Sequence, residues 1–124
     1  MKKKLNKKQL RSSADRIWYE ILMIKHPYCE ACGAPAQQIH HFYYKGSYGH
    51  LRYNLDNGIG ICMKCHFLLH HQDPKKVEER IKEKRGDKWF EDLKEKSRNR
   101  PTSFVSVKWF KDKIDSLNEY YINL

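Results

Sequence analysis

Four cysteines and four histidines stand at spacings that are typical of metal ligands. The cysteines form two CxxC pairs; a His-His dipeptide lies between the pairs, and an HxxxH begins directly after the second pair. Four soft thiolates suit a closed structural zinc, whereas clustered imidazoles suit an open, reactive metal. The sequence can therefore supply two metal sites of different character. The residues are Cys29, Cys32, Cys62 and Cys65, and His40, His41, His66 and His70.

The two CxxC pairs predict a structural Zn²⁺ site. Each pair can chelate from a tight turn, and four thiolates satisfy the tetrahedral preference of zinc with no position left for water. Disulfide bonds are the alternative, but thiols stay reduced in the cytoplasm, where we expect the protein to be located. Such a site holds structure and does no chemistry.

The histidines predict a second metal site. His66 and His70 lie four apart on an expected helix, so both imidazoles face one side and can share an ion. Neighbouring residues of a strand face opposite sides, so only one of His40 and His41 can join that ion, and the other is free to take a proton from water. The alternatives are a second structural zinc and a polar surface. A closed zinc would lack its fourth ligand here, whereas three protein ligands plus water is a catalytic arrangement.

The charge of the chain points to a polyanionic partner. The formal net charge is +10 at pH 7 over 124 residues. Lysines and arginines gain affinity when they neutralise phosphates and release counterions, so nucleic acid is the expected partner. No apolar run approaches the length of a membrane span, and the lysines at the N-terminus are followed by polar residues rather than by a signal segment. We therefore expect no membrane association.

The elements that must position these side chains predict a small α+β fold with one limited core, which a metal would help to stabilise. Strands are expected over residues 38–44 and 58–62, followed by a helix over residues 63–71. Together they form a strand, loop, strand, helix core. The expected divisions are a basic N-terminal arm (1–11), an N-terminal helix (12–26), the metal-binding core (27–72) and a helical C-terminal extension (73–124).

The ends of the expected helices follow from their capping residues. Ser12 or Ser13 can cap the N-terminal helix, which Pro27 would end. In the extension, Asp73 and Pro74 predict the start of a first helix and Gly86 its end. A second helix carries Trp89, and the last one has an apolar seam that we expect to pack on the Trp89 helix. The seam residues are Val107, Phe110, Ile114, Leu117, Tyr121 and Leu124.

Three stretches of residues 29–70 resemble the HNH, or ββα-metal, nuclease family in its zinc-stapled form. They read CEACG, QIHHF and DNGIGICMKCHFLLH. The resemblance implies a ββα-metal core in which His40, His66 and His70 bind a catalytic ion and His41 is the general base. It also implies that Asn57, rather than the alternative Asn54, orients the base through a hydrogen bond.

The ligand set implied by the resemblance bears on the choice of metal. Many family members carry aspartate where this chain has His40, so the site here is all imidazole, as in the nuclease colicins. Imidazoles favour Zn, Ni, Co or Mn over Mg, which prefers oxygen ligands. The expected cofactors are thus the structural Zn²⁺ and one catalytic divalent ion, drawn from Zn, Ni, Co, Mn and Mg.

The function implied by the family is metal-dependent endonucleolytic hydrolysis of DNA, which we expect to be double-stranded. Arg52 and Lys45 are the candidate phosphate contacts, and Tyr44 can stack on a base or sugar, although loop packing explains it equally. The alternative is a non-catalytic zinc-stabilised module that binds nucleic acid. A third reading is a scaffold whose C-terminal seam recruits proteins of a phage packaging or recombination complex.

Overall fold

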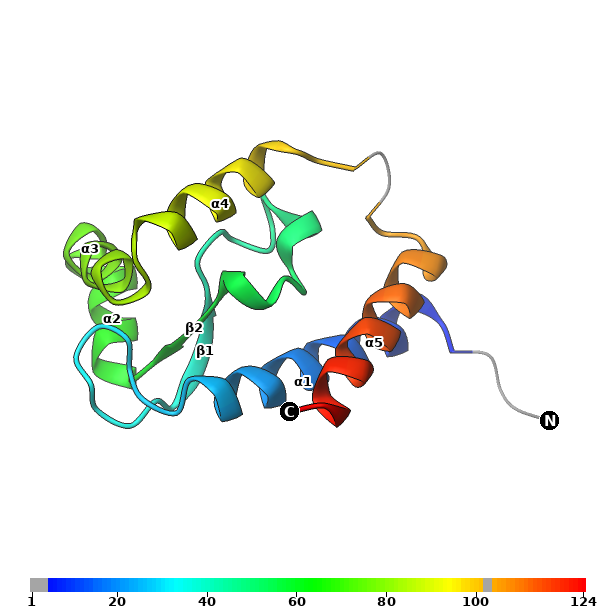
Figure 1. Cartoon of the computed structure of the whole chain (residues 1–124), viewed down its shortest axis with the longest axis horizontal. Coiled ribbons are helices and arrows are strands. Elements are labelled where there is room, and N and C mark those ends of the chain that lie inside the picture. Colours follow the sequence, from blue (N-terminus) through cyan, green and yellow to red (C-terminus); the bar gives the residue numbers. More distant parts are fainter. Residues whose placement is uncertain (1–4, 102–103) are drawn as a thin grey trace.

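The computed structural model describes residues 5–101 and 104–124. Figure 1 shows the sheet at the centre, between the helices of residues 63–98 and the N-terminal and C-terminal helices, which lie side by side. The fold class is therefore small α+β, as expected. In chain order the elements are α1 (Lys7–Lys25), β1 (Gln38–His41), 3₁₀ helices at Gly49–Leu51 and Leu55–Asn57, β2 (Gly58–Ile61), α2 (Met63–His71), α3 (Pro74–Arg85), α4 (Asp87–Arg98) and α5 (Val107–Ile122).

Helix α1 begins earlier than the sequence predicted. Asn6 caps it: its side chain accepts from the Gln9 amide at 2.9 Å, and the Gln9 side chain accepts from the Asn6 amide at 3.0 Å. This capping box satisfies two amides that the first turn of a helix leaves unpaired. Residues 7–11 are thus helical, and the prediction of a start at residue 12 was wrong. Residues 1–4 of the expected arm lie outside the described residues.

The sheet is shorter than predicted, and its two strands pair antiparallel. Gln38 pairs with Ile61 and His41 with Gly58, so the expected strand residues 42–44 and Cys62 lie outside it. Helix α1 lies close against β2 because the strand carries glycine at two positions. A Cβ on Gly60 would lie 2.5 Å from the carbonyl oxygen of His26, and one on Gly58 would meet the side chain of Leu22.

Helices α3 and α4 follow the predicted signals at Asp73, Pro74 and Gly86. The side chain of Asp73 accepts from the Lys76 amide at 3.2 Å, and Pro74 is the first residue of α3. Gly86 separates α3 from α4 with a φ of +95°, a conformation that residues with a Cβ rarely adopt. The prediction of both helices and of the boundary between them is confirmed.

Helix α5 packs on a partner other than the predicted one. Figure 1 shows α5 alongside α1, and their contact forms a core that includes Trp18 and Tyr53. The expectation that the α5 seam packs on the Trp89 helix was wrong, because α1 offers a longer apolar stripe. Trp89 instead packs on Phe42 and the second core. The buried residues of the first core are Leu10, Ala14, Trp18, Ile21, Leu22, Tyr53, Phe110 and Leu117.

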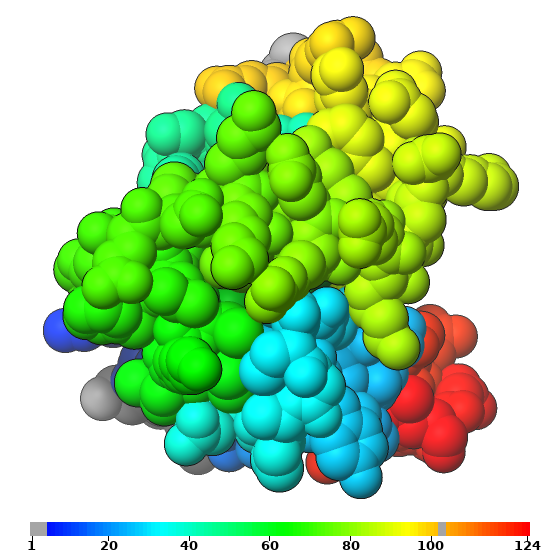
Figure 2. All heavy atoms as spheres, turned by 90° about the vertical axis from the view of Figure 1, so that its left-hand side faces the viewer, coloured from blue at the N-terminus to red at the C-terminus, as the bar shows by residue number. Residues whose placement is uncertain are grey.

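A second core joins β2 to α2 and α3, and a buried ion pair closes it. Figure 2 shows this end of the molecule, with α2 and α3 in green beside the segment around residue 30 in cyan. The guanidinium of Arg85 pairs with Glu30 and donates to the Gly58 carbonyl at 2.7 Å. Glu30 in turn accepts from the Gly60 amide at 2.9 Å. The end of α3 is therefore tied to both β2 and the segment that carries the first CxxC pair.

Candidate functional site

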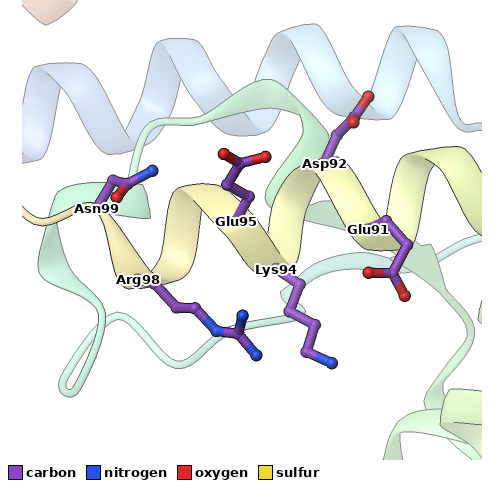
Figure 3. A pocket seen from close by; sticks show the side chains of 6 residues that line it. All are labelled: Glu91, Asp92, Lys94, Glu95, Arg98 and Asn99. Atoms are coloured by element: carbon purple, nitrogen blue, oxygen red, sulfur yellow. The ribbon is translucent and has the colours of Figure 1, made fainter.

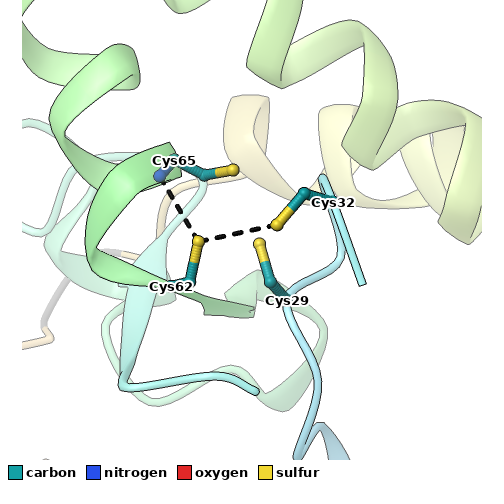
Figure 4. Close-up of side chains that lie close together, drawn as sticks. All are labelled: Cys29, Cys32, Cys62 and Cys65. Atoms are coloured by element: carbon teal, nitrogen blue, oxygen red, sulfur yellow. Dashed lines mark hydrogen bonds between the residues drawn. The ribbon is translucent and has the colours of Figure 1, made fainter. Parts of the chain in front are cut away.

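The four cysteines come together as the spacing predicted. Their sulfur atoms all lie within 4.8 Å of one another, and Cys32 and Cys62 are 3.6 Å apart (Figure 4). Two thiolates on a tetrahedral zinc, each bonded at about 2.3 Å, are separated by roughly 3.8 Å. A disulfide would require a separation of about 2.05 Å, and all four cysteines are free. The cluster can therefore hold a structural metal ion such as zinc.

Backbone turns aim the sulfurs of the cysteine cluster at one point. Gly33 adopts a φ of +83° directly after Cys32, and its amide donates to the Cys29 carbonyl at 2.8 Å. Cys62 caps α2, and its sulfur accepts from the Cys65 amide at 3.4 Å. Burial opposes ionisation of Cys62, but this amide and the neighbouring thiols outweigh it and lower its pKa to about 7. Cys62 is thus prepared to act as a thiolate ligand.

Three histidines form a second cluster. His40 comes from β1, and His66 and His70 come from successive turns of α2, with ligand nitrogens all within 4.8 Å of one another. The Nε2 atoms of His66 and His70 are 2.9 Å apart. Two nitrogens on a tetrahedral ion, each bonded at about 2.05 Å, are separated by roughly 3.3 Å, so this arrangement fits a shared ion. His70 is exposed, and the cluster therefore opens to solvent.

The imidazoles of this cluster are held in the form that binds metals. Burial, followed by the proximity of His66 and His70, lowers the pKa of His40 to about 3. Burial also lowers the pKa of His66. His40 and His66 are thus neutral near pH 7, and each offers a lone pair. Together with His70, these two imidazoles form a group that can hold a metal ion at a position open to solvent.

His41 faces away from this cluster, as the alternation of a strand predicted. Its ring stacks on Trp18, and its Nε2 lies 3.0 Å from the carbonyl oxygen of Arg52. A carbonyl only accepts, so Nε2 must carry the proton and Nδ1 the lone pair. Burial, and next the charges of Lys45 and Arg52, lower the pKa of His41 to about 4, although the bond to the Arg52 carbonyl opposes this. The ring is therefore neutral near pH 7 and can accept a proton through Nδ1.

Asn57 has a different role from the one expected. It is fully buried, its Oδ1 accepts from the Tyr43 amide at 2.8 Å, and its Nδ2 donates to the carbonyls of Tyr43 and Leu51 at 3.1 and 3.3 Å. Among the described residues, none of its hydrogen bonds goes to His41. The prediction of a direct bond to the base was wrong. Asn57 instead holds the loop that carries the Arg52 carbonyl. Because this carbonyl contacts His41, Asn57 affects His41 only indirectly.

Arg52 is also engaged elsewhere than predicted. Its guanidinium forms a bidentate pair with Asp15 of α1, at 2.9 and 2.7 Å. This pair occupies two of the five guanidinium N–H donors and balances the positive charge with a carboxylate, so the role of a free phosphate clamp does not fit Arg52. Asp15 and Trp18 are the functional neighbours that the sequence did not reveal. Both lie on α1, far from the motif in sequence, and no local pattern marks them.

Lys45 is exposed and lies beside a groove on the His41 side. The groove has a volume of about 290 Å³, and Arg11 contributes a further positive charge to its wall. Tyr44 is exposed as well, and its ring stands edge-on to His40 with centroids 6.4 Å apart. In the loop that follows β1, Tyr44 therefore lies near His40 and Lys45 lies near His41.

Another surface depression lies away from these residues. It measures about 420 Å³ and runs along one face of α4 (Figure 3). Acidic and basic side chains alternate there, with no cysteine or histidine among them. The depression therefore has neither metal ligands nor a uniform charge, and we assign it no role. Its lining residues are Glu91, Asp92, Lys94, Glu95, Arg98 and Asn99.

Comparisons with models of protein families, with curated proteins and with solved structures found no match for the chain. In the described part of the chain, no helix combines the length and the apolar character that a membrane crossing needs.

Proposed function

We propose that the protein is a metal-dependent endonuclease of the HNH, or ββα-metal, type that hydrolyses phosphodiester bonds of DNA. The observation that carries the proposal is the arrangement around β1. Three imidazoles converge on one side of the strand, and the next residue, His41, presents a neutral imidazole on the other side. A purely structural zinc site does not need this fourth histidine.

The residues of the chain would share the work as follows. His40, His66 and His70 would hold a divalent ion, which when bound neutralises charge on the scissile phosphate and on the departing oxygen. His41, fixed by Trp18 and the Arg52 carbonyl, would accept a proton from the attacking water through Nδ1. Lys45 would draw the phosphate backbone toward this edge. The four cysteines would hold a structural zinc, and their reduced thiols support a cytoplasmic location.

One observation favours the alternative, a zinc-stabilised module that binds nucleic acid without cutting it. A pKa of about 4 makes His41 a weak base near pH 7, and proton transfer is most effective when the pKa of the base lies near the working pH. Charge and metal content are the same under both proposals. Cleavage is therefore the property that separates them.

The decisive experiment is nicking of supercoiled plasmid by the zinc-loaded protein with Mn²⁺ or Ni²⁺ added. His41→Ala should slow cleavage by about 100-fold or more while zinc content and DNA affinity stay unchanged. His70→Ala should abolish the response to added metal. His71→Ala is the matched control, since His71 is exposed on the same turn of α2 but lies outside the cluster. Cleavage by His41→Ala at the wild-type rate would refute the assignment of the base.

A further inference from the structure

An aromatic pocket lies beside the histidine cluster. It measures about 310 Å³ and is formed between the loop that follows β1 and the helices α3 and α4. Lys82 and Glu78 of α3 supply its charged side chains. The remaining lining residues are all aromatic: Phe42, Tyr43, Tyr44, Tyr48 and Phe90.

Tyr44 is the open ring of this pocket. It is 60% exposed, whereas Phe42, Tyr43, Tyr48 and Phe90 are partly buried and pack on one another. Phe42 and Phe90 stand nearly perpendicular, at 79° with centroids 6.1 Å apart. An aromatic side chain that only held the loop would be more deeply buried than Tyr44 is. The exposed ring of Tyr44 is therefore available to a flat ligand.

The pocket and the histidine cluster share a wall. The ring of Tyr44 lines the pocket and also stands edge-on to His40, one of the three clustered histidines. A ligand held against Tyr44 therefore lies next to the histidine cluster. If a phosphate of a DNA strand faces the histidines, the neighbouring nucleotide of that DNA strand lies at the pocket.

Lys82 and Glu78 are the charged side chains of the pocket wall. The ammonium of Lys82 lies 4.1 Å from the centroid of Phe90, and that of Lys94, which does not line the pocket, lies 5.9 Å from the same ring. The chain as a whole carries a formal charge of +10. A ligand with a flat aromatic ring and a negative backbone fits the exposed ring of Tyr44 and these two lysines.

We propose that this pocket stacks an unpaired nucleobase of the strand whose phosphate faces the histidine cluster. The proposal rests on the proposed function and narrows its substrate. Bases within a duplex are covered by their neighbours on both faces, so only a base that has left the stack can enter. The preferred substrate is therefore single-stranded DNA, or a duplex interrupted by an unpaired base, rather than the fully paired duplex expected from the sequence.

The test measures binding instead of cleavage. The full-length zinc-loaded protein carrying His41→Ala is titrated with fluorescent oligothymidylate, and with an abasic strand of the same length that has the same phosphates but no bases. Stacking of one base contributes about 1–3 kcal/mol, so oligothymidylate should bind about 5- to 150-fold tighter. Adding Tyr44→Ala should reduce this preference several-fold and leave the affinity for the abasic strand unchanged.

Two further variants make the result specific to the ring of Tyr44. Tyr44→Phe keeps the aromatic face and should retain the preference. Tyr28→Ala is the matched control, because Tyr28 is 64% exposed but lies outside the pocket, and it should change neither affinity.

The possible outcomes separate this inference from the proposed function. Equal affinity for the two strands, an equal loss of both affinities in Tyr44→Ala, or no binding of either strand would overturn the inference. Plasmid cleavage by the wild type together with equal strand affinities would leave the proposed nuclease standing and remove the base pocket. If the wild type instead fails to cleave plasmid with every metal added, a base preference that depends on Tyr44 would support the pocket and refute the nuclease.

Discussion

The imidazole of His41 lies flat on the indole of Trp18, with ring centroids 4.2 Å apart and planes inclined by 11°. Trp18 also donates from its indole nitrogen to the carbonyl of Asn54 at 3.1 Å. One residue of α1 thus fixes both the ring of the candidate base and the loop that carries the Arg52 carbonyl. The position of His41 depends on a helix outside the metal-binding core.

Replacing Trp18 should therefore affect both stability and His41. Trp18→Phe keeps an aromatic face but removes one of the two donors to the Asn54 carbonyl, which still accepts from the Asn57 amide, so we expect a loss of about 2 kcal/mol in urea unfolding. Trp18→Leu also removes the stack, and we expect a larger loss of stability and slower plasmid cleavage at an unchanged zinc content. Equal cleavage by Trp18→Leu and wild type would show that the stack does not position His41.

The cysteine cluster predicts a linkage between metal content and folding. Cys32→Ser removes one thiolate at an exposed position, so the protein should hold one zinc fewer per chain and lose several kcal/mol of stability, about 3 or more. Elemental analysis and thermal unfolding measure the two effects. Full zinc content with an unchanged melting temperature would contradict the assignment of Cys32 as a ligand.

Asn57 should matter for stability through its backbone contacts. Asn57→Ala removes three hydrogen bonds to loop groups, and we expect the free energy of unfolding to fall by about 2–4 kcal/mol. Asn54→Ala is the matched control, since Asn54 caps the adjacent 3₁₀ helix through one exposed bond and should cost about 1 kcal/mol. Similar losses in the two variants, measured by urea titration of zinc-loaded protein, would refute the bracing role.

The pair between Arg52 and Asp15 predicts coupled effects. The side chains are 20% and 42% exposed, so solvent weakens their attraction, and we expect a coupling free energy of about 0.5–1 kcal/mol. It is obtained from the urea unfolding of Arg52→Ala, Asp15→Ala and the double variant. Arg52→Ala keeps its carbonyl and should still nick plasmid, whereas a strong loss of cleavage at unchanged stability would restore the phosphate clamp.

His26 predicts how stability changes with pH. Its Nε2 accepts from Arg85 at 3.1 Å, and burial followed by the charge of Arg85 lowers the pKa of His26 below 6.5, while Glu30 and Asp56 oppose this and Lys25 adds to it. The unfolded chain then binds a proton at a higher pH than the folded chain does. Stability should therefore decrease as the pH falls through 6.5 toward the folded value.

The variant His26→Gln isolates this contribution. Its amide oxygen can still accept from Arg85 but does not titrate. The metal ligands of the two proteins are the same, so the difference in unfolding free energy between wild type and variant reports His26 alone. The difference should change between pH 7 and pH 5, with the wild type losing more. A difference that is constant over this range would contradict the prediction.

Local patterns were sufficient to predict the parts of the molecule that depend on short spacings. The CxxC pairs, the i, i+4 spacing of His66 and His70, and the caps at Asp73 and Gly86 all act over a few residues. The alternation of a strand was likewise enough to place His40 and His41 on opposite faces. These features follow from chain geometry, which a sequence states directly.

The contacts that the sequence did not predict join residues far apart in the chain. Arg52 and Asp15 are separated by 37 positions. The apolar seam of α5 could pack on either of two amphipathic helices, and it packs on α1. Which partner wins depends on how the whole chain packs. Asn57 is an example. The sequence predicted a hydrogen bond from Asn57 to His41, but the side chain bonds to the backbone of Tyr43 and Leu51 instead.

The ion pair between Arg85 and Glu30 means that the segment with the cysteines and histidines depends on α3 for its stability. A fragment that stops at residue 72 retains every candidate metal ligand but lacks Arg85. The carboxylate of Glu30, which is 4% exposed, would then be buried without its cation. An unpaired buried charge is among the costliest defects a small protein can carry. A segment transferred to another protein would therefore have to include α3 as well as these histidines and cysteines.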